Sequence, residues 1–264
     1  MSILRPPPPA ALAAAFIGCA GSGIPGVLAG DFPGPGSHLE RYARVFGCTE
    51  INTSFYRPHR HTTYARWAAS VPDAFRFAVK LPRTITHEAQ LVDVDILLDR
   101  FHAEASGLGH KLGCVLVQLA PSLAFDAARA GAFFIALRQR FDCMVACEAR
   151  HRSWFEDDAT ALLRATGVTR VVADPAKGQP GAHVPTTAAI YTRLHGSPRV
   201  YYSAYAPDYL ARVGQDILTH TAAGRPLWCI FDNTASGAAS ANALVLQRAV
   251  TAGAGALQSA IAPD

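Results

Sequence analysis

The chain has 264 residues, of which 50% are hydrophobic and 17% are charged, and its mean hydropathy is +0.14. Charged residues reach roughly 25% in an average soluble domain, so this composition excludes a disordered or acidic solvating chain. The formal net charge of +4 is too small to indicate a protein that coats nucleic acid, but it suits an anionic small substrate. The length is close to the roughly 250 residues of one α/β barrel.

The N-terminal segment begins with one arginine, Arg5, followed by four consecutive prolines. A secretory signal places its basic residues directly before an apolar run, so we interpret 1–15 as a disordered Pro/Ala-rich tail. We expect 16–253 to form one domain and 254–264 to form a C-terminal tail. No apolar stretch reaches the roughly 18 residues of a membrane helix, so we expect a cytoplasmic protein without membrane contact.

The six cysteines lie at positions 19, 48, 114, 143, 147 and 229, with no CxxC pair and no zinc-finger spacing. Five of them fall in apolar runs, where a thiol acts as a small buried hydrophobic group. This pattern favours free thiols in a reducing cytosol over disulfides or metal-cluster ligands.

Short apolar runs alternate with segments of helical periodicity along the chain. Several runs are almost continuously apolar, as parallel strands covered on both faces should be. The predicted strands are 16–19, 49–52, 75–80, 114–118, 144–148, 170–172, 190–194 and 228–231.

Helical stripes separate most of these strands. In the first, Leu39, Tyr42 and Phe46 repeat at helical spacing behind a Ser37-x-x-Glu40 capping box. Further stripes start near positions 64, 94, 130, 162, 210 and 239, whereas 175–185 is rich in Gly and Pro and shows no helix. Eight strands with intervening helices favour right-handed crossovers closed into a single (β/α)8 TIM-type barrel. An open doubly wound sheet is the alternative, because closure leaves no mark on the sequence.

The active site of such a barrel forms at the C-terminal ends of the strands. Nearly every predicted strand delivers a charged or amide side chain there, and these groups are costly to bury unless they are paired. We expect acid–base chemistry, with Glu148 as base, Lys80 as its electrostatic partner and His195 as proton donor. Glu50 and Asp174 are further candidate catalytic carboxylates, and a Schiff base on Lys80 is a sharper alternative.

The competing interpretation is that the carboxylates pair with neighbouring cations and only brace the barrel. If the site is functional, the substrate-binding residues are expected at the same strand ends and in the loops that follow them. These candidates are Asn52, Tyr56, Arg83, His87, Gln118, Arg150, His151, Arg193, Gly196, Asp232, Asn233 and Thr234.

A divalent metal is the second interpretation of this mouth, as in metal-dependent isomerases and hydrolases. Glu148, Asp174, His195 and Asp232 would supply mixed oxygen and nitrogen ligands. No HxH, HxxxH or ExxH spacing occurs within one strand or loop, so we predict neither a metal nor another cofactor.

The expected partner is a small anionic or sugar-like molecule. The segments 195–197 and 233–237 follow the last two strands, where barrels usually bind phosphate, although ordinary helix capping is an equal alternative. Aromatic and basic residues in 55–61 and 201–205 suit a nucleotide or sugar, or else loop packing. A non-catalytic barrel that binds nucleotide or nucleic acid is therefore the second choice, and the oligomeric state stays open.

The spelling Gly21-x-Gly23-x-x-Gly26 matches a dinucleotide fingerprint, but glycines and prolines fill the next ten residues. No helix is expected to open there and hold a pyrophosphate, so we reject a dinucleotide site.

Five motifs follow one another along the chain. They are Glu50-Ile-Asn-Thr-Ser-Phe-Tyr-Arg57, Phe75-Arg-Phe-Ala-Val-Lys80 with Pro82-Arg83-Thr-Ile-Thr-His87, Glu148-Ala-Arg-His151-x-Ser-Trp154, Arg193-Leu-His-Gly196, and Asp232-Asn-Thr with Gly237 and Asn242-Ala-Leu. In this order they resemble the YecE-like family, known as domain of unknown function 72, from Phe16 to about Val250. The resemblance implies a TIM barrel and brings no established activity. The chain departs from the family pattern after the first strand, where Ala20-Gly-Ser-Gly-Ile-Pro25 replaces an aromatic Gly-Trp-x-Tyr turn. The contribution of that aromatic residue is therefore absent or supplied by Tyr201 and Tyr202.

Overall fold

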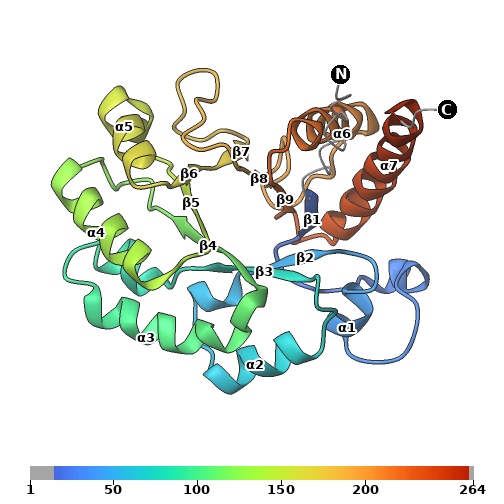
Figure 1. Cartoon of the computed structure of the whole chain (residues 1–264), viewed down its shortest axis with the longest axis horizontal. Helices are drawn as coiled ribbons and strands as arrows, with labels where there is room; N and C mark the ends of the chain where they lie inside the picture. Colours follow the sequence, from blue (N-terminus) through green and yellow to red (C-terminus); the bar gives the residue numbers. More distant parts are fainter. Residues whose placement is uncertain (1–14, 262–264) are drawn as a thin grey trace, which may run out of the picture.

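Parallel strands alternate with helices throughout residues 15–261, which the computed structural model describes (Figure 1). The tail predicted for 1–15 therefore lies outside the described residues, apart from Ala15, which begins the first strand. The strands are β1 (Ala15–Cys19), β2 (Cys48–Ile51), β3 (Arg76–Lys80), β4 (Leu112–Gln118), β5 (Met144–Glu148), β6 (Thr169–Arg170), β7 (Val172–Asp174), β8 (Ile190–Leu194) and β9 (Leu227–Phe231).

The strands form two parallel sheets, with the orders β1-β9-β8-β7 and β2-β3-β4-β5-β6. The predicted α/β class with parallel strands is confirmed, whereas closure into one barrel is not, because the hydrogen-bonded ladders of the two sheets are not continuous. The sixth predicted strand is interrupted at Val171, so that β6 joins one sheet and β7 joins the other. At the opposite seam a single bridge, between Ala20 and Glu50, connects the end of β1 with β2.

The seam between β1 and β2 is close-packed because of a glycine. A Cβ atom on Gly18 would lie 2.2 Å from the carbonyl oxygen of Cys48, so only glycine allows this approach. Two side chains bridge the seam as well. Thr49 donates to the carbonyl of Cys19 at 3.0 Å, and the Tyr42 hydroxyl accepts from Cys19 N and donates to Cys48 O.

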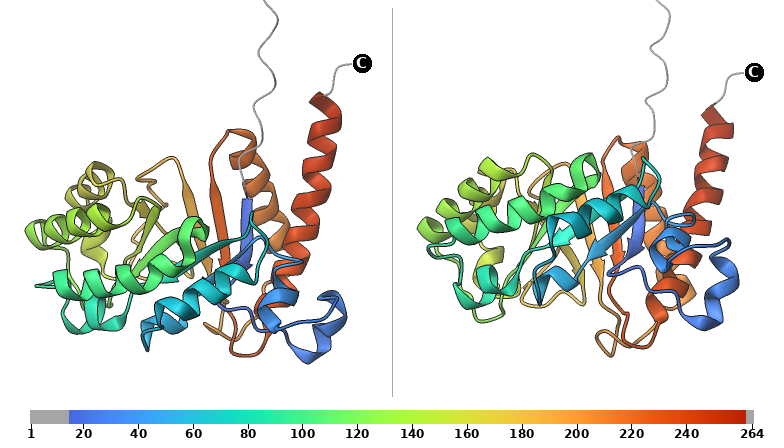
Figure 2. Two further views of the ribbon diagram at one scale, coloured as in Figure 1. Left: turned by 60° about the horizontal axis from the view of Figure 1, so that its bottom comes forward. Right: turned by 90° about the horizontal axis from the view of Figure 1, so that it is seen from below.

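The helices lie around the outside of the strands (Figures 1 and 2). The predicted capping box is present, since Ser37 and Glu40 exchange side-chain to backbone hydrogen bonds at the start of α1. No helix forms between β7 and β8, as the sequence predicts. The helices are α1 (His38–Tyr42), α2 (His61–Ala69), α3 (Asp95–Ala105), α4 (Ala127–Arg140), α5 (Asp157–Ala165), α6 (Pro207–Ala222) and α7 (Ala238–Ile261).

Three boundaries differ from or refine the sequence prediction. The first helix stops at Tyr42, although Phe46 is still buried in the core. The glycine motif is followed by a short 3-10 turn over Gly26–Asp31 rather than an α-helix, which agrees with the absence of a dinucleotide site. Helix α7 continues to Ile261, past residue 253, and its C-terminal end projects beyond its neighbours in Figure 2.

The space enclosed by the sheets is apolar at one end and charged at the other. Because side chains alternate along a strand, residues two apart face the same side. Cys48 and Ala78 belong to the apolar cluster inside the sheets, and the residues two positions later are Glu50 and Lys80. The charged groups are therefore at the carboxyl ends of the strands, above an apolar floor.

All six cysteines are free thiols, and five of them are buried. Burial raises the pKa of Cys19 and of Cys229 to about 12, so these thiols stay protonated near neutral pH. None of the helices within residues 15–261 is long and apolar enough to cross a membrane.

Gly18→Ala tests the close approach at the β1–β2 seam. The added methyl group forces the strands apart, and we expect a loss of about 1–3 kcal/mol in the free energy of unfolding. Urea denaturation measures this loss. Gly30→Ala is the matched control, because a Cβ atom there has no neighbour within 4 Å, and an equal effect of the two changes would contradict the packing argument.

Candidate active site

A cluster of charged and amide side chains occupies the carboxyl ends of the strands. Each member continues the inward-facing phase of its strand, two residues after an apolar inward side chain. Tyr191, Arg193 and His195, for example, follow one another at this spacing along and beyond β8. The other inward residues are Glu50 on β2, Lys80 on β3, Gln118 on β4, Glu148 on β5 and Asp232 directly after β9.

Arg193 lies at the centre of the cluster with 0% of its surface exposed. It donates from Nε and Nη2 to the two oxygens of Glu50, at 3.0 and 2.6 Å. It also donates to Glu148 Oε2 at 2.5 Å and to Asp232 Oδ2 at 3.0 Å. Tyr191 donates its hydroxyl to Glu50 at 2.9 Å. The sequence predicts that Arg193 binds the substrate. Its guanidinium instead forms ion pairs with three carboxylates, so it neutralises them and fixes their positions.

His195 lies between two of the same carboxylates. Its Nδ1 is 2.9 Å from Asp232 Oδ2, and its Nε2 is 3.2 Å from Glu148 Oε1. Burial opposes the charged form, but the hydrogen bonds to Asp232 and Glu148 raise the pKa of His195 above its usual value. Since ionised carboxylates only accept hydrogen bonds, both ring nitrogens carry protons and His195 is an imidazolium. Both protons are engaged, which argues against its predicted role as proton donor.

Both carboxylate oxygens of Glu148 accept hydrogen bonds from neighbouring side chains. Its Oε1 accepts from Gln118 at 3.2 Å and from Arg150 at 2.9 and 3.0 Å, in addition to His195. Burial alone raises the pKa of a carboxyl group, but Arg193 and His195 hold the pKa of Glu148 well below its usual value. A carboxylate stabilised in this way has little affinity for a proton, so the geometry disfavours the predicted role of Glu148 as general base.

Lys80 is the cation that the network leaves out. The predicted ion pair with Glu148 does not form, and among the described residues no carboxylate lies within ion-pair distance of the Lys80 amine. The Nζ atom instead lies 4.1 Å from the centre of the Phe55 ring. Burial, assisted by the charge of Arg193, lowers the pKa of Lys80 to about 8. A substantial part of this amine is therefore neutral at slightly alkaline pH.

Lys80 is buried, with 5% of its surface exposed. Within residues 15–261 no side chain or backbone group forms a hydrogen bond or ion pair with its amine. Lys80 is thus a charged member of the cluster without a polar partner among the described residues.

Four further predicted binding residues lie in or next to the cluster. Gln118 and Arg150 donate to Glu148, and Asn52 donates to Asp232 over a long 3.5 Å. His87 packs at a steep angle against the Phe55 ring, with 4.9 Å between the ring centres.

Asp174 lies outside the cluster, although the sequence placed it among the catalytic carboxylates. Val171 and Ala173 face the apolar interior, so Asp174 points to the opposite side, where it accepts from the Tyr205 hydroxyl at 2.9 Å. Gly196 donates its backbone N–H to the same hydroxyl at 2.8 Å.

Several other predicted binding residues serve local structure. His151 accepts from the backbone of Ser153, in the turn after β5, and the Asn233 amide donates to Asn242 and to a backbone carbonyl. Thr234 is exposed in the loop before α7. These contacts give no evidence for an anion at this end of the barrel.

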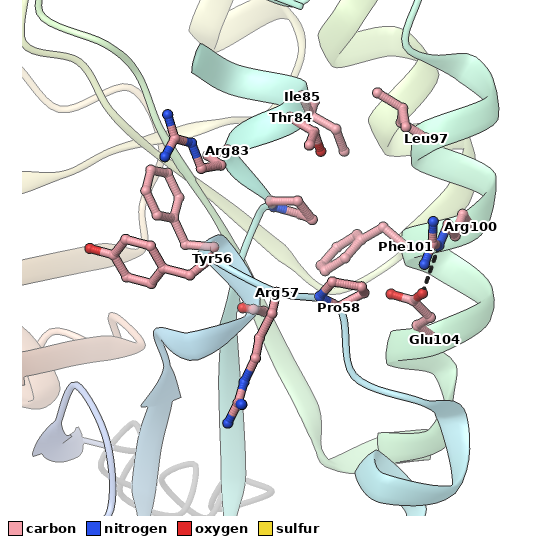
Figure 3. A pocket seen from close by; sticks show the side chains of 13 residues that line it. Tyr56, Arg57, Pro58, Arg83, Thr84, Ile85, Leu97, Arg100, Phe101 and Glu104 are labelled. Atoms are coloured by element: carbon pink, nitrogen blue, oxygen red, sulfur yellow. Dashed lines mark hydrogen bonds and ion pairs between the residues drawn. The ribbon is translucent and has the colours of Figure 1, made fainter. Parts of the chain in front are cut away.

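Tyr56 and Arg83 line a separate pocket of about 120 Å³, shown in Figure 3. Tyr56 is 71% exposed, and Arg83 pairs with Glu88 at 3.0 Å on the surface. In Figure 3 the side chains of Tyr56 and Arg83 point away from the ion pair of Arg100 and Glu104 on α3. The two residues flank the turn that carries Phe55, at the rim of the mouth rather than inside it.

The residues proposed as metal ligands do not gather as a metal site would require. Among residues 15–261 no three His, Cys, Asp or Glu side chains are arranged to hold a metal ion. Asp174 points elsewhere, and Arg193 and His195 already occupy the oxygens of Glu148 and Asp232. This donor set does not fit the metal-dependent alternative.

Aromatic side chains contribute to the site in ways that the sequence only partly indicates. Tyr191 is not among the predicted site residues, although its position two residues before Arg193 places it on the same face. Of the two alternatives for the segments 55–61 and 201–205, stacking on a ligand or loop packing, the structure shows packing contacts: Phe55 lies against Lys80, and Tyr201 packs edge-to-face with His195 at 5.8 Å between ring centres.

Comparison with known proteins agrees with this architecture. The family model described as "Protein of unknown function DUF72" matches residues 16–264. The chain belongs to the DUF72 family. The resemblance noted from the sequence motifs is thereby confirmed.

Curated relatives of the family include the UPF0759 protein YecE of Escherichia coli, 34% identical over 142 residues, and the UPF0759 protein YunF of Bacillus subtilis, 27% identical over 148 residues. Each alignment covers 52% of this chain and 52% of the relative, so the match spans about half the length of these curated proteins.

Two solved structures of DUF72 family proteins share the fold. One, from Enterococcus faecalis, has a TM-score of 0.76 at 21% identity and covers 90% of this chain and 96% of its own. The other, from Thermotoga maritima, has a TM-score of 0.75 at 24% identity and covers 90% and 99%.

Arg193→Met tests the central position of the guanidinium in this DUF72 protein. The change leaves three buried carboxylates without their shared cation, and we expect a loss of about 3–5 kcal/mol in the free energy of unfolding. Urea denaturation measures it. Arg248→Met is the control, because that arginine pairs with Asp31 at the surface, where a loss below about 1 kcal/mol is expected.

Lys80→Met tests the unpaired amine through the pH dependence of stability. The pKa is about 8 in the folded chain and about 10.4 when unfolded. Below pH 8 both states are protonated, so the folded protein bears the full cost of the buried charge. We expect the variant to be more stable than the wild type by about 2–4 kcal/mol at pH 7.

This stability difference should shrink between pH 8 and pH 10.5, because the folded wild type releases its proton there while the unfolded chain retains it. Urea denaturation at pH 7 and pH 9.5 is the measurement, with Lys177→Met as an exposed control. A stability difference that is the same at both pH values would contradict the lowered pKa of Lys80.

Proposed function

We propose that this DUF72 protein is an enzyme that performs acid–base chemistry on a small anionic or sugar-like molecule, with Lys80 as the group that exchanges the proton. The observation that carries the proposal is the Lys80 amine, which has no ion pair among the described residues although the charges around it are paired with one another. An amine with a pKa of about 8 is suited to this role, because it takes up and releases protons close to physiological pH.

The charge of the site supports an anionic substrate. At pH 7 the three carboxylates Glu50, Glu148 and Asp232 face Arg193 and Arg150, and the imidazolium of His195 balances the remaining negative charge. Protonated Lys80 is then a surplus positive charge. An anion bound beside it restores neutrality, and the release of the proton to solvent or substrate has the same effect.

The entry to the charged cluster is narrow. The cavity beside Glu148, Arg150 and His195 is about 10 Å³, which is space for about one water molecule, so a larger substrate has to move a side chain to reach these residues. Tyr201 lies directly over His195, so a substrate that reaches the cluster has to displace this ring or enter from the side of Lys80 and Phe55.

We also propose that the two sheets, whose hydrogen-bonded ladders are not continuous, together form one (β/α)8 barrel. Val171 donates its N–H to Cys147 O at 3.0 Å, so the residue that separates β6 from β7 keeps a ladder bond. The bridge between Ala20 and Glu50 supplies the corresponding link on the other side. The carboxyl ends of all strands then surround a single mouth, which is the usual place of a barrel active site.

Proton exchange with deuterated water tests the proposed chemistry without knowledge of the natural substrate. The full chain is incubated in D₂O with pyruvate, dihydroxyacetone phosphate, glucose 6-phosphate and further small anionic carbonyl compounds. Proton NMR follows the loss of the signal next to the carbonyl group. We expect exchange in at least one compound, with a rate that increases with pH through an apparent pKa of about 8.

Lys80→Met should reduce this exchange by about 100-fold or more, the usual contribution of a general acid or base. Arg248→Met is the control, because that arginine pairs with Asp31 at the surface. Folding of both variants is verified by circular dichroism. Absence of exchange across the panel, or exchange that Lys80→Met leaves intact, would refute the proposed function.

A further inference from the structure

We propose that the Lys80 amine acts covalently, by forming an imine with the carbonyl group of a small anionic aldehyde, ketone or keto acid. The inference deepens the proposed function and rests on it, since both concern the same site. It names the substrate class, a carbonyl compound that carries a carboxylate or phosphate, and it assigns the proton transfer that follows to a second residue, His87.

The geometry around Lys80 favours a nucleophile over a structural cation. The amine donates no hydrogen bond within the described chain and lies over the ring of Phe55, 4.1 Å from its centre, rather than against a carboxylate. The positive charge of Arg193 repels a proton on Lys80, and this repulsion favours the neutral, nucleophilic form of the amine. A lysine that only braced the barrel would be expected in an ion pair.

The step balances without any bound cofactor. The neutral Nζ attacks the carbonyl carbon, and the π electrons move to the oxygen, which takes a proton to give a carbinolamine. The hydroxyl group leaves as water after a second protonation, and the nitrogen loses one proton to solvent in the process. The product is a protonated imine, whose positive charge lowers the pKa of the C–H bond next to it.

His87 is positioned to accept that proton. It packs edge-on against Phe55, the same ring that Lys80 faces. Its Nδ1 shares a hydrogen bond of 2.8 Å with Thr86, whereas Nε2 has no hydrogen bond to a described residue. Burial, together with the charge of Lys80, lowers the pKa of His87, so the ring is neutral and able to act as a base at pH 7.

The lysines of the chain provide internal controls for a chemical test. The sequence holds three, Lys80, Lys111 and Lys177. Lys111 is buried and donates to the carbonyls of Ala68 and Val71, at 2.7 and 2.8 Å, so its amine is engaged. Lys177 is exposed and lines the cavity beside Glu148, Arg150 and His195, so it shows how an exposed amine at the same mouth reacts.

Reductive trapping tests the imine directly. The full chain is treated at pH 7.5 with glyoxylate, a small anionic aldehyde, and cyanoborohydride, which delivers hydride to an imine carbon and leaves a carboxymethyl group on the nitrogen. Peptide mass spectrometry then measures the rate at each lysine. We expect Lys80 to be modified about tenfold or more faster than Lys177, because more of its amine is neutral.

Two variants make the outcome specific. Lys177→Arg should leave the modification of Lys80 unchanged, whereas Lys80→Arg should leave only the slow background at Lys177. Equal rates at Lys80 and Lys177, or modification of Lys177 alone, would overturn the inference. If exchange in D₂O still depends on Lys80 in that case, the proposed function stands and the amine acts without a covalent bond.

His87→Asn separates the two steps. The variant should retain glyoxylate trapping at Lys80, because the imine forms without a base at the neighbouring carbon. Its proton exchange, measured on the compound that the wild type exchanges, should be about 100-fold slower. Exchange that persists at the wild-type rate would remove His87 from the proposal, and loss of trapping as well would show that His87 affects Lys80 itself.

Discussion

The interaction on which the rest of the structure depends is the contact of one buried guanidinium with three carboxylates. Arg193 and Asp232 come from one sheet, whereas Glu50 and Glu148 come from the other. The backbone joins these sheets weakly, through a single bridge at one seam and an interrupted strand at the other. The ion pairs therefore tie the two sheets across the interior. Their desolvation cost is large, and it is offset only because the bidentate geometry and additional donors satisfy the carboxylates.

The same network determines the chemistry that remains available. Arg193, His195 and Arg150 bind the oxygens of Glu148, and no carboxylate of residues 15–261 forms an ion pair with Lys80. The carboxylates lose basicity for the same reason, as the lowered pKa of Glu148 shows. The ion pairs therefore agree with the interpretation that these carboxylates stabilise the fold. The functional interpretation then depends on one side chain, Lys80, whose amine has no ion pair among the described residues.

The sequence was sufficient to predict the strands and the polar ends, because the period of two is visible in each apolar run. The same period would have excluded Asp174, since Val171 and Ala173 are the inward residues of that strand and Asp174 is out of phase with them. The sequence was not sufficient to predict which cation pairs with Glu148. Lys80 and Arg193 each follow a strand in the same phase, and the choice between them depends on how far a side chain extends across the interior.

The free-energy cost of burying the Lys80 amine also bears on its role. A network selected only to hold two sheets together would be most stable with its charges balanced, which Glu50, Glu148, Asp232, Arg150, Arg193 and His195 achieve without Lys80. A buried amine added to this set costs free energy at pH 7, as its lowered pKa records. An apolar side chain at position 80 would extend the floor formed by Cys48 and Ala78 and avoid that cost. The amine is therefore better explained by a molecule that it meets at the mouth than by the fold that carries it.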